Sequence, residues 1–371
     1  MSAAKPRLLV VSNYRLDGPS RPEAEIYLAL AARGFSITVI AHGDSPYVRR
    51  FRDSGIRVLY GHPEGRNDKP AQAVIRAELL AAAPYDALVL YNSRAIANGV
   101  RAAKGIDVTV VVYRGYTGDL RWYDPTVYLK IYHPRVDAIL CNNVGVQRHI
   151  QANRWWSRED ITHVVWKGHD LDWYAGVEPL DKSALAIPAD APMVVCVANA
   201  AKFKGVRYLL QAFALLDASL GARLVLCGHR MDTPTHRRLA AQAPHPERIL
   251  FPGYREDVLE LVAAADVKVL PSIYGESLTK AAFEAMAVGT AVLITDIPGN
   301  EELVEHGVSG WKVPPKDPAA IARGLERLLS DGDLRRNLAH GARERLAGPL
   351  SHARTVDAME AFFVGLQNVS A

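Results

Sequence analysis

Short apolar runs rich in β-branched residues recur along the chain and alternate with stretches in which apolar residues follow a helical period. In the first half these runs are Arg7–Ser12, Ser36–Ala41, Ile56–Tyr60, Ala87–Tyr91, Val108–Tyr113, Ala138–Cys141 and Ile161–Trp166. Helical patterns lie between most of them, as in Pro22–Arg33 and Ala71–Ala83. Continuous apolar strands that alternate with helices are typical of a parallel sheet covered on both faces.

The alternation stops between Gly168 and Pro192, a stretch rich in proline, aspartate and glycine. It then resumes, and its runs are Val194–Ala198, Arg223–Cys227, Arg248–Phe251, Val267–Leu270 and Ala291–Thr295, with a mostly helical pattern from Asp317 to about Val364. We therefore predict an α/β protein with two doubly wound domains, residues 1–170 and 191–350. A linker over residues 171–190 would join them, and a helix over residues 351–371 would follow. Sheets of this kind bind ligands at the carboxyl ends of their strands, which predicts a site in a cleft between the domains.

The overall composition is that of an ordinary globular protein. Of 371 residues, 49% are hydrophobic and 23% are charged, and no apolar run approaches the roughly 18 residues that span a bilayer. The net charge of +4 is too small to indicate a nucleic-acid-binding protein. The three cysteines lie in or at the end of apolar runs and lack metal-ligand spacing, which favours buried, reduced thiols. We expect a cytoplasmic protein.

The first half of the chain is more basic than the second. Through Asp170 it holds 23 lysines and arginines against 16 acidic residues, whereas the remainder holds 21 against 24. This excess favours an anionic partner or peripheral contact with the cytoplasmic face of a membrane. A solvated basic surface would explain it equally well.

Two carboxylates eight residues apart follow the strand Val267–Leu270, in the sequence GESLTKAAFEAMAVG. The segment is predicted to be a helix, and it is apolar almost all round, which indicates burial. On one helix, Glu276, Lys280 and Glu284 would form a polar stripe that could simply face solvent. Its place after a strand favours a ligand site instead. A helix that begins near Ser277–Thr279, after Glu276, would offer free N–H groups, which bind phosphate. The two acids could then accept hydrogen bonds from hydroxyl groups of a sugar and of a ribose.

The region around these acids resembles the E-x7-E region of the retaining family 4 glycosyltransferases. The resemblance is carried by Glu276, by EAMAVG at Glu284–Gly289 and by Pro298–Glu302, and it is dense from about Val194 to Leu329. It implies the GT-B fold, with two Rossmann-like domains facing a central cleft and a C-terminal helix packing back toward the first domain. It also implies metal-independent transfer of a sugar from a nucleotide diphosphate, with retention of the anomeric configuration.

The resemblance assigns a donor site to the second domain. Glu276 would orient the sugar, Glu284 would bind the ribose, and Lys204 would stabilise the leaving diphosphate. Asn199 stands where the family often has an arginine, and Lys202 could supply that charge. The remaining donor contacts implied by the family motifs are the backbone groups of Ser277, Leu278 and Thr279 and the turn at Gly253 and Tyr254.

The first domain departs further from the family. The loop expected over Tyr14–Pro22 has a single glycine where relatives often have two, and Gly18 and Ser20 are its candidates for phosphate or acceptor contact. The histidine that many relatives carry after the strand Val108–Tyr113 is missing. The acceptor candidates at that place are Arg114, Tyr116 and Asp119.

The resemblance thus predicts a hexosyl or related glycosyltransferase, with a UDP-sugar preferred over a GDP-sugar as donor. The expected acceptor is a saccharide, a lipid-linked saccharide or another small molecule, in cell-surface polysaccharide or glycoconjugate synthesis. No metal, no other cofactor and no nucleic acid is expected. An epimerase or phosphorylase of the same architecture would not explain the paired acids with a Lys-Gly partner. A catalytically silent relative that binds a sugar nucleotide or a partner protein remains an alternative, favoured by the missing arginine and histidine.

Overall fold

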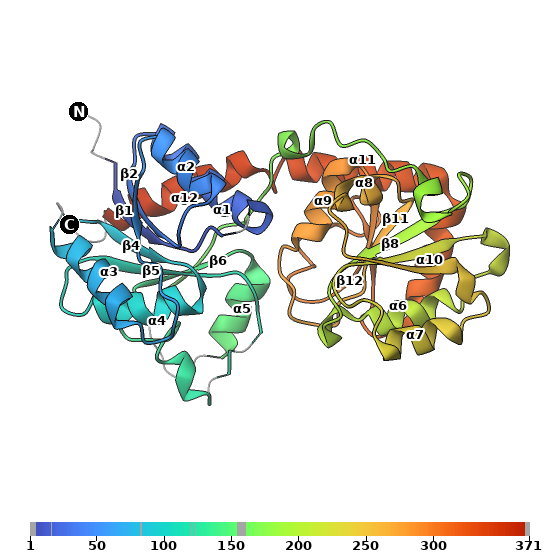
Figure 1. Ribbon diagram of the computed structural model, residues 1–371, viewed down its shortest axis with the longest axis horizontal. Coiled ribbons are helices and arrows are strands. Elements are labelled where there is room, and N and C mark those ends of the chain that lie inside the picture. Colours follow the sequence, from blue (N-terminus) through green and yellow to red (C-terminus); the bar gives the residue numbers. More distant parts are fainter. Residues whose placement is uncertain are drawn as a thin grey trace. The chain divides into compact units, whose positions relative to one another are not determined.

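The computed structural model describes residues 5–15, 17–81, 84–118, 120–121, 123–153 and 161–367. The chain forms two compact units, which are described separately. Unit 1 comprises Met1–Gly168 with His352–Ala371, and unit 2 comprises His169–Ser351. In each unit a parallel sheet lies between layers of helices (Figure 1). The predicted α/β fold with two Rossmann-like domains is confirmed.

Unit 1 is built on a seven-stranded parallel sheet in the order β3-β2-β1-β4-β5-β6-β7. Its strands are β1 (Arg7–Val11), β2 (Ser36–Ala41), β3 (Arg57–Tyr60), β4 (Ala87–Leu90), β5 (Thr109–Arg114), β6 (Ala138–Cys141) and β7 (Thr162–Val164). Successive side chains of a strand face opposite layers, as Leu8 and Val10 pack in one core and Leu9 and Val11 in the other. Burial on both faces explains why the central strands, such as β1, β4 and β6, are continuous apolar runs.

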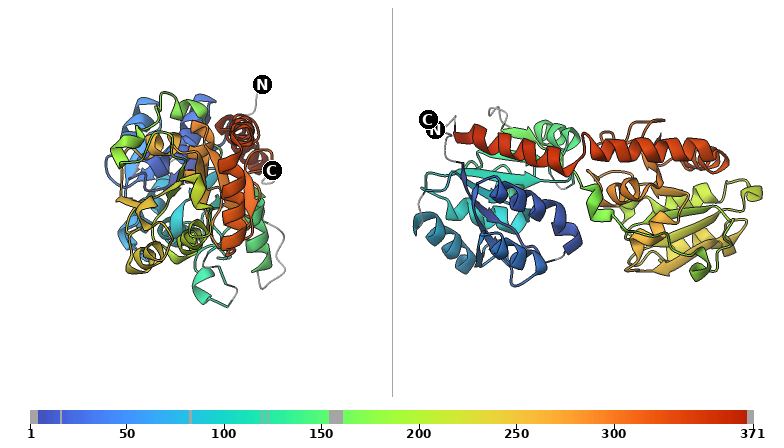
Figure 2. Two further views of the ribbon diagram at one scale, coloured as in Figure 1. Left: turned by 90° about the vertical axis from the view of Figure 1, so that its right-hand side faces the viewer. Right: turned by 90° about the horizontal axis from the view of Figure 1, so that it is seen from above.

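The helices of unit 1 cover both faces of its sheet. One core contains residues of α1 (Asp17–Ala32), α2 (Pro46–Asp53) and α12 (His352–Gln367), and the other contains residues of α3 (Lys69–Ala81), α4 (Asn92–Ala102) and α5 (Val144–Ala152). The short 3₁₀ helix η1 (Pro125–Val127) follows β5. The last helix, α12, packs against α1 through Val356, Met359 and Phe363, so the end of the chain completes the core of the first unit (Figure 2).

Unit 2 contains a six-stranded parallel sheet in the order β10-β9-β8-β11-β12-β13. The strands are β8 (Met193–Val197), β9 (Arg223–Cys227), β10 (Ile249–Gly253), β11 (Val267–Leu270), β12 (Ala291–Thr295) and β13 (Trp311–Val313). The helices are α6 (Val206–Phe213), α7 (Pro234–Ala241), α8 (Val258–Ala263), α9 (Lys280–Val288), α10 (Pro318–Ser330) and α11 (Gly332–Ala347). The 3₁₀ helices are η2 (Leu171–Tyr174), η3 (Lys182–Leu185), η4 (Lys202–Lys204), η5 (Ala218–Leu220) and η6 (Pro246–Arg248). The sequence pattern does not predict the three-residue strand β13.

The loop predicted over Tyr14–Pro22 is shorter than expected. Helix α1 begins at Asp17, which places Gly18 and Ser20 in its first turn rather than in a loop. The first turn of a helix has N–H groups without helical partners, so a proline there removes nothing. Pro22, further along, removes a single helical hydrogen bond. The two prolines of this segment therefore suggested a loop where a helix forms.

Among the described residues, no helix combines the length and the apolar character needed to cross a membrane.

Candidate active site

The candidate residues of unit 2 come from two loops that follow neighbouring strands. Lys204 ends η4 in the loop after β8, and Glu276 lies in the loop after β11, the strand that pairs with β8. The carboxyl ends of parallel strands share one edge of a sheet, so these loops are adjacent. The amide of Ile273 in the second loop donates to the carbonyl of Phe203 in the first over 2.7 Å. The backbone therefore fixes the spacing of the two loops.

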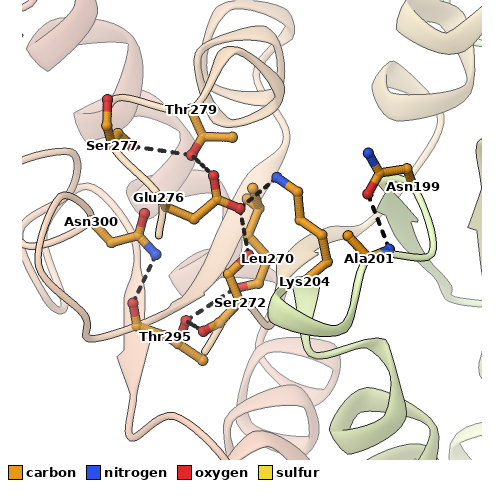
Figure 3. Close-up of polar contacts among 10 residues, drawn as sticks. All are labelled: Asn199, Ala201, Lys204, Leu270, Ser272, Glu276, Ser277, Thr279, Thr295 and Asn300. Carbon is orange, nitrogen blue, oxygen red and sulfur yellow. Dashed lines mark hydrogen bonds and ion pairs between the residues drawn. The ribbon is translucent and has the colours of Figure 1, made fainter. Parts of the chain in front are cut away.

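Glu276 is a buried carboxylate whose two oxygens both accept hydrogen bonds (Figure 3). Lys204 Nζ lies 2.5 Å from Oε1, and Ser272 Oγ donates to the same oxygen over 2.6 Å. Thr279 Oγ1 donates to Oε2 over 3.1 Å. Only 8% of the Glu276 side chain and 19% of the Lys204 side chain are exposed. A buried ion pair with additional hydrogen bonds is held in one geometry, so the two side chains predicted to be catalytic form a pre-arranged unit.

A second layer of buried polar residues anchors the Glu276 loop. Thr295 Oγ1 donates to the carbonyl of Ser272, and Asn300 Nδ2 donates to the carbonyl of Thr295 over 3.0 Å (Figure 3). All three side chains are at most 1% exposed. The sequence analysis gives them no role. The signal that could have found two of them is a polar residue at or just beyond the end of a buried strand, because Thr295 ends β12 and Ser272 is the second residue after β11.

Helix α9 begins close to the start near Ser277–Thr279 that the sequence predicts. Glu276, Ser277 and Leu278 precede it, Thr279 is its N-cap residue, and the helix starts at Lys280. Glu276 therefore precedes the helix and Glu284 lies within it, as the predicted helix start near Ser277–Thr279 requires. Thr279 makes no side-chain capping bond, and its hydroxyl donates to Glu276. The first-turn amides are thus left uncapped by this side chain, which suits an anionic ligand.

Glu284 lies within α9 and is 7% exposed. It forms an ion pair with Lys280, one turn earlier, whose side chain is 45% exposed. An exposed partner gives such a pair little net stability. Glu284 is therefore a nearly buried carboxylate whose counter-charge is partly exposed.

Lys268 is a further charged group of this region that the sequence analysis missed. It lies in the centre of β11, is fully buried, and its Nζ has no hydrogen-bond partner among the described residues. Burial lowers the pKa of Lys268 to about 8, against the opposing effect of Cys196 and Glu284. A single lysine in an apolar run is compatible with a strand, so the sequence pattern does not indicate that Lys268 is buried without a partner.

Replacing Lys268 with methionine, of similar length and no charge, should raise the free energy of unfolding at pH 7 by about 3 kcal/mol. The native state disfavours the protonated amine, so the wild-type penalty is complete below about pH 8 and disappears toward pH ~10.4, where an unfolded lysine titrates. The stability difference between Lys268→Met and the wild type should therefore shrink as the pH rises. Urea unfolding at pH 7 and pH 10 measures both effects.

Lys182→Met is the matched control for this prediction. Lys182 Nζ donates to the carbonyl of Ala191 over 2.9 Å and lies 3.5 Å from Asp266 Oδ2. Its replacement removes satisfied contacts and should lower stability. If Lys268→Met lowered the free energy of unfolding at pH 7, as Lys182→Met is expected to do, the prediction would be contradicted.

The loop after β8 contains two more of the predicted donor residues. Asn199 is exposed, and its Oδ1 accepts from the amide of Ala201 over 3.1 Å, so it shapes the turn before η4 (Figure 3). Lys202 is exposed, and its side chain makes no hydrogen bond or ion pair with the described residues. Lys202 is the basic side chain of this loop that is open to an anionic ligand, beside the paired Lys204.

The predicted base-contacting turn lies at the end of β10. Gly253 has a φ of +79°, and its carbonyl accepts from the amide of Gly228 over 2.8 Å. Tyr254 is 62% exposed and stacks on His229 with ring centroids 4.6 Å apart. This aromatic pair at the carboxyl edge of the sheet is compatible with a nucleobase, and His229 is a member that the sequence analysis missed.

In unit 1 the structure brings two of the predicted acceptor residues together. Arg114 ends β5 and is 7% exposed, and its Nε donates to the carbonyl of Tyr116 over 2.8 Å. Its guanidinium lies 3.6 Å from the centroid of the Tyr116 ring. Gly18 and Ser20 belong to α1, and Asp119 lies outside the described residues.

The match of this sequence to a glycosyltransferase family model lies in unit 2. Residues 177–345 match the family model for glycosyl transferases group 1. LpsE of Rhizobium meliloti (strain 1021), a lipopolysaccharide core biosynthesis glycosyltransferase, is 30% identical over 229 residues, 61% of this chain and 64% of LpsE. The chain thus spans less than two thirds of this relative, and about half or less of several others.

Solved structures with a similar fold cover nearly the whole chain. HepE of Anabaena in complex with UDP has a TM-score of 0.77 at 18% identity, covering 97% of this chain and all of HepE. A glycosyltransferase from Rickettsia africae has a TM-score of 0.79 at 17% identity, covering 98% of this chain and 99% of that one. The two Rossmann-like units are those of the GT-B fold, and residues 177–345 of unit 2 match the group 1 glycosyl transferases.

Proposed function

We propose that this protein is a metal-independent, retaining glycosyltransferase that uses a UDP-hexose as donor. The observation that carries the proposal is the buried Lys204–Glu276 pair beside the uncapped start of α9. HepE, whose fold is similar, has been solved with UDP and with UDP-glucose, which supports UDP over GDP as the carrier. The name of LpsE supports a saccharide or lipid-linked saccharide acceptor of the cell surface.

In the proposed reaction the bond between the anomeric carbon and the diphosphate breaks as a bond to an acceptor hydroxyl forms on the same face. The acceptor proton moves to an oxygen of the departing diphosphate. Lys204 has three N–H donors, so it can hold Glu276 and a diphosphate oxygen at the same time. The amides at the start of α9 add their dipole to the same charge. Glu276, fixed by three donors, orients the sugar, and Glu284 holds the ribose.

Thermal-shift measurements with UDP-, GDP-, ADP- and dTDP-glucose test the donor. A ligand at a hundred times its dissociation constant stabilises the protein by about 2.7 kcal/mol, so the preferred nucleotide is identified without knowledge of the acceptor. We expect the largest rise in Tm with UDP-glucose. A larger rise with GDP-glucose would overturn the UDP assignment, and no rise with any of the four would overturn the proposal. Tight donor binding without turnover on any acceptor would identify the silent relative.

Glu284→Ala should weaken UDP binding by about ten- to a hundred-fold, because hydrogen bonds from ribose hydroxyls to a carboxylate contribute about 1.5–3 kcal/mol. Its kcat at saturating donor should change little. Isothermal titration with UDP measures the affinity. Lys280→Ala removes the same ion pair but keeps the carboxylate, so it should bind UDP nearly as the wild type does. Equal losses of UDP affinity in the two variants would show that UDP binding depends on the Lys280–Glu284 ion pair and not on a contact between Glu284 and the ribose.

A further inference from the structure

Unit 1 contains a cavity of about 680 Å³ that the donor residues do not line. Its walls come from the first turn of α4, from the end of β5, and from η1 and the residues around it. Because β4, which leads into α4, and β5 are neighbours in the sheet, the cavity lies at the carboxyl edge, where such sheets bind ligands. Its size is that of a small-molecule site.

The described residues that line this cavity carry an excess of positive charge. The cations are Arg66, Arg114, Arg121 and Lys130, and the one carboxylate is Asp124. That carboxylate is already used, since Asp124 Oδ1 accepts from the amide of Thr126 at the start of η1 over 2.9 Å. Arg66 is exposed, and its side chain makes no hydrogen bond or ion pair with the described part of the chain. Arginine clusters of this kind bind phosphate and carboxylate groups.

Two exposed aromatic rings accompany these cations. Tyr116 is 42% exposed and Tyr123 is 59% exposed, and both line the cavity. Each ring is held by an arginine, Tyr116 by the Arg114 guanidinium at 3.6 Å and Tyr123 by Arg121, which donates to its hydroxyl over 2.8 Å. Exposed tyrosines held in place supply apolar ring faces beside polar groups, which suits a pyranose ring.

We propose that this cavity binds the acceptor of the reaction and that the acceptor is an anionic saccharide. Arg66 and Arg121 would hold its phosphate or carboxylate group, while a sugar ring lies against the two tyrosines. The inference rests on the proposed glycosyl transfer, and it adds the chemical class of the acceptor, which neither the family nor the donor residues specify. A concave cavity of limited volume, rather than a basic strip along the surface, favours a short saccharide over a polyanion.

Isothermal titration in the presence of saturating UDP tests this inference. The probes are glucose 6-phosphate, glucuronate and neutral glucose. We expect at least one anionic probe to bind at least ten-fold more tightly than glucose, and added salt to weaken that binding. Arg66→Ala and Arg121→Ala should each weaken binding of the anionic probe by about ten-fold and leave the affinity for UDP unchanged.

Arg52→Ala is the matched control. Arg52 is exposed and, like Arg121, donates to a tyrosine hydroxyl, that of Tyr60, over 2.5 Å, but it does not line the cavity. Arg52→Ala should change neither the affinity for the anionic probe nor the affinity for UDP. The inference would be overturned, and the proposed function would stand, if the protein bound UDP but bound glucose as tightly as it binds both anionic probes. The same holds if neither cavity substitution weakened binding of the anionic probe. A folded protein that does not bind UDP would overturn the acceptor assignment together with the proposed function.

A second arm distinguishes the source of the anion. Phosphatidylcholine vesicles with and without phosphatidylglycerol are sedimented with the wild type and with Arg66→Ala. Binding to the anionic vesicles that requires Arg66 would support the inference and indicate a lipid-linked acceptor. Binding of the soluble anionic probe alone would support it and indicate a water-soluble acceptor.

Discussion

Glu276→Ala is expected to lower kcat by about a hundred- to a thousand-fold while UDP affinity stays within a few-fold of the wild type. Removing a group that stabilises the transition state from a fixed position typically lowers kcat by this factor. Glu276 has such a position, since its two oxygens accept from Lys204, Ser272 and Thr279 in a nearly water-free environment. Its loss also releases Lys204, the cation proposed to stabilise the diphosphate. Steady-state kinetics with UDP-glucose, together with titration of UDP, separates turnover from binding.

Two companion variants sharpen this test. Glu276→Gln keeps the shape but loses the charge, so activity close to wild type would assign Glu276 a purely structural role. Breaking a buried ion pair by removing one partner costs about 3–5 kcal/mol of stability, so the melting temperature of each variant must be measured. Lys204→Ala combined with Glu276→Ala should lose much less than the product of the single losses, because the pair acts as a unit. A kcat for Glu276→Ala within a few-fold of the wild type would contradict the assignment.

The central strands of both sheets could be predicted because they are buried on two faces. Ala87–Leu90 is an unbroken apolar run whose four residues are all buried in the structure, and a pattern of this kind needs no knowledge of the partner strand. Helix starts were less predictable. Pro22 and Gly18 suggested a loop where α1 forms, whereas the start of α9 at Lys280 lies close to the predicted one.

The candidate site could be predicted only as far as its motif extends. Glu276 and Lys204 are 72 residues apart, and the resemblance, not the residue pattern, joined them before the structure showed their 2.5 Å contact. The anchoring of the loop by Ser272, Thr295 and Asn300 depends on how two loops pack, which no local periodicity records. The same holds for the cationic cavity of unit 1, whose charges come from segments as distant as Arg66 and Lys130.

The close approach of the two site loops leads to the second large expected effect. Gly205 follows Lys204 and has a φ of +67°, and a Cβ atom there would lie 1.9 Å from the carbonyl oxygen of Pro271. No side chain can move aside, because the obstacle is backbone. Gly205→Ala must therefore separate the loop of Lys204 from that of Glu276, and we expect a loss of about 4 kcal/mol or more of unfolding free energy. UDP-dependent activity should be lost even in the fraction that remains folded.

Gly221→Ala makes this prediction specific, because the two glycines share one backbone conformation. Gly205 caps η4 with φ 67° and ψ 13°, and Gly221 caps η5 with φ 62° and ψ 12°, but nothing lies within 4 Å of a Cβ at Gly221. The strain of a left-handed alanine, about 1–2 kcal/mol, is thus common to both variants. Urea unfolding measures each loss, and the difference isolates the contact between the loops. If the two alanine variants were equally stable and equally active, the loops would not depend on this contact, and the fixed geometry of the Lys204–Glu276 pair would need another origin.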